Sequence, residues 1–220
     1  MSSVMVTIYG EVMKNFEESV KFLKSKVAEV MSQVIVECPT PIFKTIEKYK
    51  PVLCGSAISS IYHGEPVHDF DFYFRTNEDV REVMDKYCEP PTVDESEEVI
   101  ADWHDYDGAT QIPKIPGKSF TYNAITFKPT KNYKYVIQFV LRNNVNECRN
   151  NFDFIHCMPV YDFFNDTLYI SEAQFQSISE KRLILSKNMQ GLPDPKRVKK
   201  FMNRGWSAKA MDMKIGRAHV

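Results

Sequence analysis

The sequence lacks any apolar run of the roughly 20 residues that a membrane-spanning helix needs. Its first nine residues carry neither a basic start nor a long apolar stretch, so we expect no secretory signal. It also lacks a C-x-x-C pair, and its five cysteines are scattered, which argues against a disulfide framework or a zinc knuckle. We therefore expect a cytoplasmic protein with reduced thiols and no membrane partner.

The chain also lacks a large net charge: its 28 lysines and arginines nearly balance its 29 aspartates and glutamates, which leaves a formal charge of −1 at pH 7. This balance excludes a protein that binds polyanions over its whole surface, so any contact with nucleic acid must be local. The strongly basic region comprises Lys181, Arg182, Lys187, Lys196, Arg197, Lys199, Lys200 and Arg204. Such a run is explained equally by a solvated helix face and by contact with the phosphates of a nucleotide or polynucleotide.

Three glycine-containing motifs of common enzyme classes are also absent. The chain has no G-x-x-x-x-G-K-[ST] loop and no G-x-G-x-x-G turn, which leaves P-loop and dinucleotide-binding folds without support. It has no G-x-S-x-G elbow either, and this argues against a serine hydrolase of the α/β type.

The most informative pattern that is present is Gly55-Ser56, followed after 12 residues by Asp69-Phe70-Asp71. Side chains alternate along a strand, so Asp69 and Asp71 are expected to project together while Phe70 points to the other face, into the core. Neighbouring carboxylates repel each other unless a cation lies between them. The pattern therefore predicts a site for a divalent metal ion.

A third acidic residue lies within a later aromatic run, Phe152-Asp153-Phe154. A lone acid in a strand is usually an edge or surface residue. Here the flanking phenylalanines predict one buried face, which leaves Asp153 on the opposite face. We take Asp153 as the candidate third ligand.

The apolar pattern predicts alternating helices and strands. Helices are expected at about 11–33, 42–49, 57–62 and 76–87 and within 171–206, and strands at 52–54, 68–74, 120–127, 133–141 and 152–157. Thr76, with Asp79 three residues later, predicts an N-terminal cap, and the runs 120–127 and 133–141 predict a hairpin. Residues 89–116 are rich in acids and proline and predict an irregular excursion. The expected fold class is α/β: a small mixed β-sheet with helices packed on one face and a helical C-terminal region.

Together, Gly55-Ser56, Asp69-x-Asp71 and Asp153 resemble the nucleotidyltransferase superfamily typified by DNA polymerase beta, over about residues 49–161. The stretches Asn123-Ala-Ile-Thr, Gln138-Phe-Val-Leu and Phe152-Asp-Phe, with the basic helix that ends in Arg204-Gly-Trp, are similar to nucleotidyltransferase-like proteins of large phages and viruses. The resemblance implies that Asp69, Asp71 and Asp153 are catalytic and bind two Mg²⁺ ions. It also implies that Gly55 and Ser56 bind the phosphates of a nucleoside triphosphate, and we add Lys181 and Arg182 as nucleotide-binding candidates.

The chemistry of nucleotidyl transfer agrees with this interpretation, because charge builds up at the α-phosphate and cations are needed more than a side-chain nucleophile. We expect a Mg²⁺-dependent enzyme that transfers a nucleoside monophosphate to an acceptor hydroxyl of RNA, a protein or a small molecule. The alternative is a catalytically inactive nucleotide-binding or interaction module on the same fold. A metal-dependent phosphoesterase would also use clustered acids. It usually adds histidine ligands, however, and the motif strands contain only His68 and His156. If the chain is viral, the host cytoplasm is the expected location.

Four segments are expected along the chain: an N-terminal helical segment (1–36), a nucleotidyltransferase core (37–165), a helical C-terminal region (166–214) and a tail (215–220). The tail Ile215-Gly-Arg-Ala-His-Val220 is what a common sequencing-adapter oligonucleotide encodes in one reading frame. We therefore expect it to be non-native. On this hypothesis the natural protein continues beyond about Lys214, and the helical C-terminal region is truncated.

Overall fold

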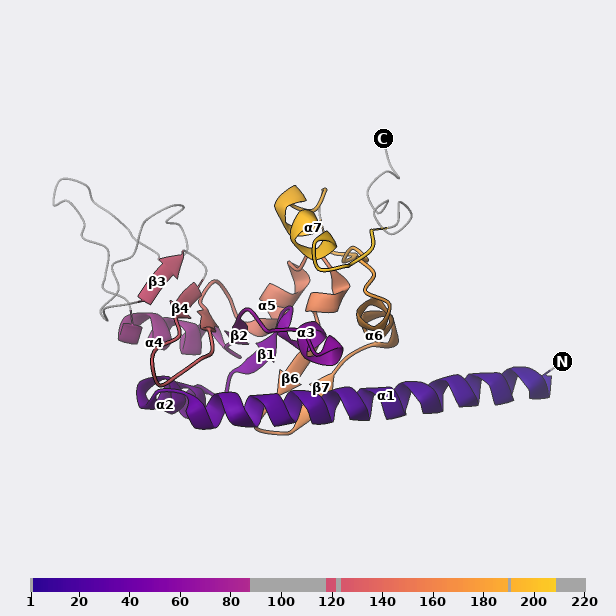
Figure 1. Cartoon of the computed structure of the whole chain (residues 1–220), viewed down its shortest axis with the longest axis horizontal. Coiled ribbons are helices and arrows are strands. Elements are labelled where there is room, and N and C mark those ends of the chain that lie inside the picture. The colour runs from indigo at the N-terminus through magenta and orange to yellow at the C-terminus, as the bar shows by residue number, and fades with distance from the viewer. Residues whose placement is uncertain (1, 88–117, 122–123, 190, 209–220) are drawn as a thin grey trace. The chain divides into compact units, whose positions relative to one another are not determined.

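The computed structural model describes residues 2–87, 118–121, 124–189 and 191–208 (Figure 1). They form two compact units. The first comprises Met1–Gln33, Cys54–Val67 and Asn150–Val220, and the second comprises Val34–Leu53 and His68–Arg149. Each unit thus combines stretches that are distant in sequence. The boundaries expected at 36/37 and 165/166 stay a prediction, and the irregular excursion expected at 89–116 lies outside the described residues.

The second unit contains the larger part of a mixed sheet, as the sequence predicts. Its strands are β1 (Val52–Cys54, of which Cys54 belongs to the first unit), β2 (Phe70–Tyr73), β3 (Lys118–Thr121), β4 (Ala124–Phe127) and β5 (Ile137–Val140), in the order β3-β4-β5-β2-β1. β2 and β5 are parallel, whereas β3 pairs antiparallel with β4 and β4 with β5. The predicted hairpin of the two β-rich runs is confirmed by the pairing of β4 with β5. The single strand expected at 120–127 is instead divided between β3 and β4.

Three helices of the second unit are α2 (Thr40–Tyr49), α4 (Asn77–Tyr87) and α5 (Val145–Asn150). The cap predicted for α4 is confirmed: the Asp79 amide donates to Thr76 Oγ1 at 3.0 Å, and the Thr76 amide donates to the Asp79 carboxylate at 3.2 Å. These two bonds satisfy backbone donors that the first helical turn leaves without partners.

Aromatic side chains fill the core of the second unit. The ring of Phe139 lies edge-on to Phe127, with centroids 5.0 Å apart, and to Phe72 at 6.2 Å. Tyr87 of α4 packs on Phe127 at 5.5 Å, and its hydroxyl shares a hydrogen bond of 2.7 Å with Thr45 of α2. Edge-to-face packing suits the charge distribution of the rings, so this cluster fixes α2 and α4 against the sheet.

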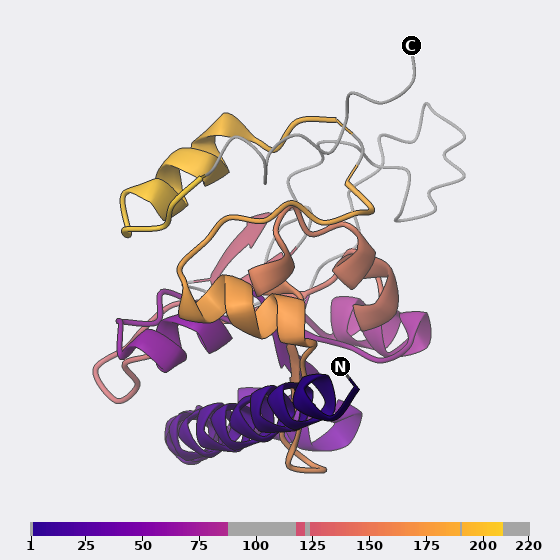
Figure 2. The same ribbon diagram turned by 90° about the vertical axis from the view of Figure 1, so that its right-hand side faces the viewer.

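In the first unit, the dominant element is α1 (Ser2–Glu37), which extends beyond the predicted 11–33. Figure 2 looks nearly along its axis. Leu23, Val27 and Met31 are 0% exposed and recur every four residues, so they form one buried stripe. No helix among the described residues is both long and apolar enough to cross a lipid bilayer.

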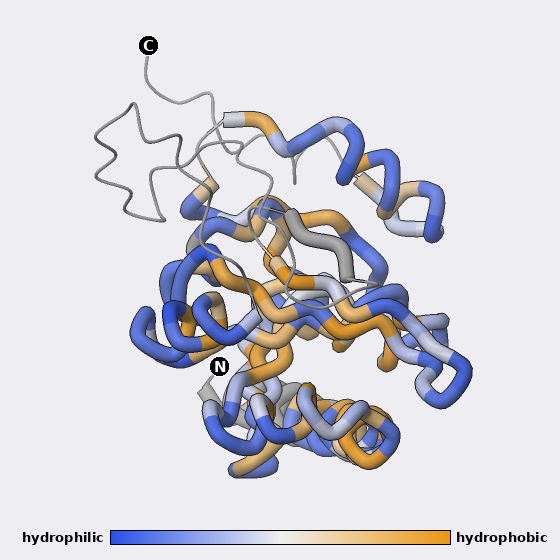
Figure 3. The backbone as a smooth tube through the Cα atoms, turned by 90° about the vertical axis from the view of Figure 1, so that its left-hand side faces the viewer, coloured by the Kyte–Doolittle hydropathy of each residue, from blue (hydrophilic) through white to orange (hydrophobic). Residues whose placement is uncertain are grey.

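The remaining elements of the first unit are α3 (Ala57–His63), η1 (Ile155–Cys157), β6 (Val160–Asp162), β7 (Thr167–Tyr169), α6 (Glu172–Ser179) and α7 (Pro195–Met202). β6 and β7 form an antiparallel hairpin. Ser171 is the N-cap residue of α6 and forms a reciprocal capping box with Gln174. In Figure 3, α7 is largely hydrophilic with short hydrophobic stretches. Its residue Phe201 is buried.

The strand predicted at 152–157 is wrong, because residues 155–157 form a 3-10 helix. Phe154 makes only an isolated bridge with Leu185. Phe154 joins a hydrophobic cluster with Leu185, Phe201 and Trp206. Phe154 is thus buried, and Phe152 partly buried, by packing against a cluster that includes a later helix and not in a sheet.

Candidate functional site

Asp69 and Asp71 lie in the second unit, at the start of β2. The Phe70 amide donates to the Val136 carbonyl at 2.9 Å, so pairing with the β5 segment begins at this point. Phe70 and Phe72 are each 1% exposed, whereas Asp69 and Asp71 are half-buried. The predicted alternation is confirmed within β2: the phenylalanines enter the core, and Asp71 between them lies on the opposite face. Asp69 immediately precedes the strand.

A polar row continues from Asp71 across the sheet. Asp71 is the register partner of Gln138 on β5, and Gln138 is the register partner of Thr126 on β4. Paired residues of neighbouring strands point to the same face, and all three side chains are half-buried. The motif search missed Gln138 and Thr126 as site residues. Each is a polar residue between apolar neighbours, but only strand pairing places them beside Asp71.

Gly55 and Ser56 lie in the first unit, between β1 and α3. Gly55 has a φ of 91°, a conformation that residues with a Cβ rarely adopt, and its amide donates to the Cys157 carbonyl at 3.0 Å. Ser56 is the N-cap residue of α3, and its side chain makes no capping hydrogen bond. The turn is therefore held by its backbone, and the Ser56 hydroxyl is not used to start the helix.

The other three predicted site residues belong to the first unit and form ion pairs there. The Asp153 carboxylate, only 15% exposed, accepts a hydrogen bond of 3.0 Å from Arg197 of α7. Lys181 donates to the Glu65 carboxylate, and Arg182 donates to Glu180 at 2.9 Å. These contacts tie α7 and the end of α6 to their neighbours. The same charges are those that the sequence suggested for metal and phosphate binding.

The structure thus places Asp71 in β2 and Asp69 directly before it, both in the second unit, and it places Gly55, Ser56, Asp153, Lys181 and Arg182 in the first. Within the described ranges, no three or more His, Cys, Asp or Glu side chains form a group that could hold a metal ion. The three-carboxylate site stays a prediction.

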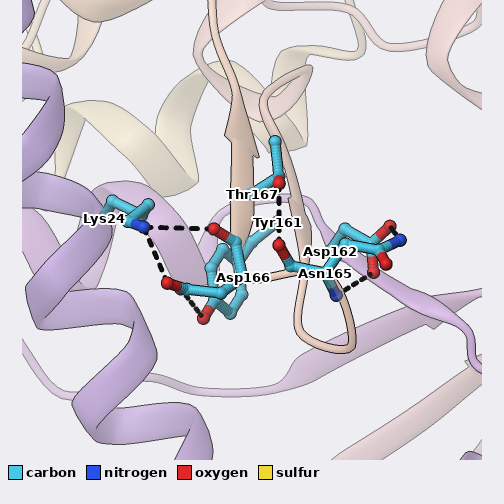
Figure 4. Close-up of polar contacts among 6 residues, drawn as sticks. All are labelled: Lys24, Tyr161, Asp162, Asn165, Asp166 and Thr167. Carbon is cyan, nitrogen blue, oxygen red and sulfur yellow. Dashed lines mark hydrogen bonds and ion pairs between the residues drawn. The ribbon is translucent and has the colours of Figure 1, made fainter.

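Further acidic residues that the motif search missed lie in the β6–β7 hairpin (Figure 4). The Asp166 carboxylate accepts hydrogen bonds from Lys24 of α1 at 2.7 Å and from the Tyr161 hydroxyl at 3.0 Å. The bond from Lys24 lowers the pKa of Asp166, and burial raises the pKa of Tyr161. Asp162, 1% exposed, accepts from the side chain of Asn165 at 2.7 Å. These acids close the hairpin turn and attach it to α1, which is a structural role.

A protein-family model described as "Gad2: Gabija anti-defense 2 family protein" matches residues 18–181. No curated protein matches the chain. Among solved structures, the chain is similar to a tRNA-processing enzyme with CTP (13% identity, TM-score 0.45, 78% of this chain and 44% of that one). It is also similar to the Thermotoga maritima CCA-adding enzyme complexed with tRNA (10%, 0.44, 84% and 43%). A third is the Bacillus stearothermophilus CCA-adding enzyme in complex with CTP (12%, 0.41, 77% and 40%). The chain spans less than half the length of these proteins.

Proposed function

The chain belongs to the Gabija anti-defense 2 family, and on this premise we propose that it is a Mg²⁺-dependent nucleotidyltransferase. It transfers a nucleoside monophosphate from a nucleoside triphosphate to an acceptor hydroxyl of RNA, a protein or a small molecule. The family name attributes to its members a role against Gabija defence, and such a role is open to an enzyme that modifies a target and to a protein that only binds one. The proposal is the enzyme.

The observation that carries the proposal is the geometry of β2. Asp71 lies in β2 and Asp69 directly precedes it, and the core face of this strand is held by Phe70 and Phe72, each 1% exposed. Rigid attachment of two carboxylates to a sheet suits a catalytic site, because their positions then need no ordering when substrate binds. A strand without function would gain from replacing two mutually repelling acids.

Oxygen ligands from aspartate are those that Mg²⁺ prefers, so the residues of β2 fit the two ions that the sequence resemblance implies. Bound Mg²⁺ would supply positive charge at the phosphate under attack. Asp69 and Asp71 would hold and orient it. In the reaction, the acceptor oxygen forms a bond to the α-phosphorus, the bond to the leaving pyrophosphate breaks, and the acceptor proton passes to solvent or a nearby base.

The roles of the residues in the first unit are part of the same proposal. Gly55 and Ser56 are proposed to bind the phosphates. Gly55 has no Cβ, so a phosphate can approach its backbone closely, and the Ser56 hydroxyl makes no capping hydrogen bond. Asp153 must exchange Arg197 for a cation to act as the third ligand. Lys181 and Arg182 must likewise exchange their glutamate partners to contact nucleotide.

Because these residues would first have to give up their present partners, a second candidate function has support: an inactive module on the same fold that binds a nucleotide or another protein. The observation in its favour is that the charges of Asp153, Lys181 and Arg182 are each neutralised within the first unit. Such a module would bind a nucleoside triphosphate without releasing pyrophosphate.

The test incubates the protein and a cell extract with each α-³²P-labelled nucleoside triphosphate and MgCl₂. We expect label on a macromolecule or small molecule with the wild type, and a loss on the order of 100-fold or more with Asp69→Asn or Asp71→Asn. Glu47→Gln is the matched control, because Glu47 is an exposed acid of the same unit. Digestion of the labelled product with ribonuclease or protease identifies the acceptor class. Label transfer that survives both Asp→Asn changes, or binding without any transfer, contradicts the enzyme.

A further inference from the structure

Gln138 and Thr126 differ from the rest of their strands. The rows on either side of them in the register, Phe70–Ile137–Phe127 and Phe72–Phe139–Ile125, are at most 4% exposed and face the core. Gln138 and Thr126 point the other way, with Asp71, and are half-buried. Strands lie about 4.8 Å apart, so the row from Asp71 to Thr126 spans about 10 Å. Gln138 and Thr126 are one strand spacing apart, beside Asp71, a separation at which both side chains can reach the hydroxyls of one sugar ring.

Neither polar side chain is used within its own unit. Over the described ranges, the Gln138 amide and the Thr126 hydroxyl make no hydrogen bond to another residue. A half-buried amide has two donors and an acceptor that lose part of their hydration. On the same face, the next register pair, Ala124 and Val140, is apolar and at most 9% exposed, so the sheet itself does not require polar side chains on this face. The strip is therefore better explained by a bound ligand than by the fold.

The chemistry of the strip limits that ligand. An amide and a hydroxyl are neutral, and each both donates and accepts hydrogen bonds. A phosphate only accepts, and it is favoured by lysine and arginine, neither of which is in the row. Vicinal hydroxyls, which also donate and accept, match the strip directly.

We propose that Gln138 and Thr126 bind the ribose hydroxyls of a substrate held at Asp69 and Asp71. The inference rests on the proposed nucleotidyl transfer and adds a ribose-binding strip to it. Two sources supply this chemistry: the ribose of the nucleoside triphosphate and the 3′-terminal ribose of an RNA acceptor. Gln138 and Thr126 are positioning residues in either case, since the bond changes occur at the phosphate and not at these groups.

The experiment measures binding by calorimetry in MgCl₂, so it needs no turnover. The probes are an α,β-methylene adenosine triphosphate with its 2′-deoxy and 3′-deoxy analogues, and a short single-stranded RNA with a 3′-hydroxyl or a 3′-deoxy end. Gln138→Met and Thr126→Val remove the hydrogen-bonding groups at similar volume. Thr40→Val is the matched control, because Thr40 is exposed in the same unit. Thermal unfolding confirms that each variant folds.

We expect each variant to bind the ribonucleotide with an affinity roughly 3- to 10-fold lower than the wild type, the effect of one lost hydrogen bond. The deoxy analogues should bind wild type and variants alike. The same pattern confined to the RNA ends assigns the strip to the acceptor and also supports the inference. Binding that depends on Asp69 but is unchanged in Gln138→Met and Thr126→Val overturns the strip and leaves the proposed function intact. Absence of binding to every probe overturns the strip, and the label-transfer test with each nucleoside triphosphate decides the proposed function separately.

Discussion

His156 is a buried base that should make the stability of the protein depend on pH. Its side chain is 0% exposed, and its ring lies 4.0 Å from that of Trp206 and 4.6 Å from that of Phe201, centroid to centroid. Neither ring nitrogen has a hydrogen-bond partner within the described part of the chain. Burial lowers the pKa of His156 from 6.5 to about 3, because a charged imidazolium would lose its hydration among aromatic rings.

The direction of the pH effect on the free energy of unfolding follows from the difference between the folded and the unfolded pKa of His156. The folded pKa lies below the unfolded one, so between about pH 6.5 and 3 the unfolded chain binds a proton that the folded chain does not. The contribution to stability is complete above pH 6.5 and is lost as the pH falls. Each pH unit costs up to about 1.4 kcal/mol, so lowering the pH from 6.5 to 5 should cost about 2 kcal/mol.

The assay is urea unfolding at pH 7, 6 and 5, followed by the emission of Trp206 in a Trp103→Phe background. His156→Phe keeps a ring in the cluster and removes the titrating group. At pH 7 it should equal or exceed the wild type in stability, because two buried polar atoms without partners are removed. The difference in free energy of unfolding between variant and wild type should then widen by about 2 kcal/mol at pH 5. Parallel profiles for His156→Phe and wild type would refute the reasoning.

Three further predictions concern stability and are measured by thermal or urea unfolding. Phe201→Ala should cost about 3–5 kcal/mol, because it empties a site that is 5% exposed in the cluster around His156; a cost below 1 kcal/mol would show that the cluster does not anchor α7. Tyr87→Phe should cost about 1–2 kcal/mol, since it removes a buried hydrogen bond to Thr45. The Thr45→Val/Tyr87→Phe pair should cost less than the sum of the single changes. Ser171→Ala should cost about 1 kcal/mol through the loss of the α6 cap, and an unchanged midpoint would contradict it.

Local sequence was sufficient for the elements that depend on local interactions. The Thr76–Asp79 cap, the strand at 52–54 and the helix that contains Leu23 were all predicted, because capping bonds and apolar periods join residues within a few positions of each other. The alternation of Asp71 with buried phenylalanines was predicted for the same reason. Side chains alternate between the two faces of a strand, so the face of one residue can be predicted from whether its neighbours are apolar.

Asp153 shows where this reasoning ends. Phe152-Asp153-Phe154 has the same alternation as Phe70 and its neighbours, yet residues 155–157 form a 3-10 helix. The difference comes from Phe201 and Trp206, which pack on Phe154 and His156 from a distant part of the chain. The ion pair of Asp153 with Arg197 has the same origin. No local pattern can report a partner that only the folded chain brings near.

The sequence alone therefore determined the mixed α/β class, the Gly55-Ser56 turn and the face of β2 on which Asp71 lies, since all three follow from spacing along the chain. The tertiary structure decided that Gln138 and Thr126 continue the row from Asp71 and that Asp153 is held by Arg197. The physical reason is that register and ion pairs join residues far apart in sequence, and their free energy depends on which segments fold against one another.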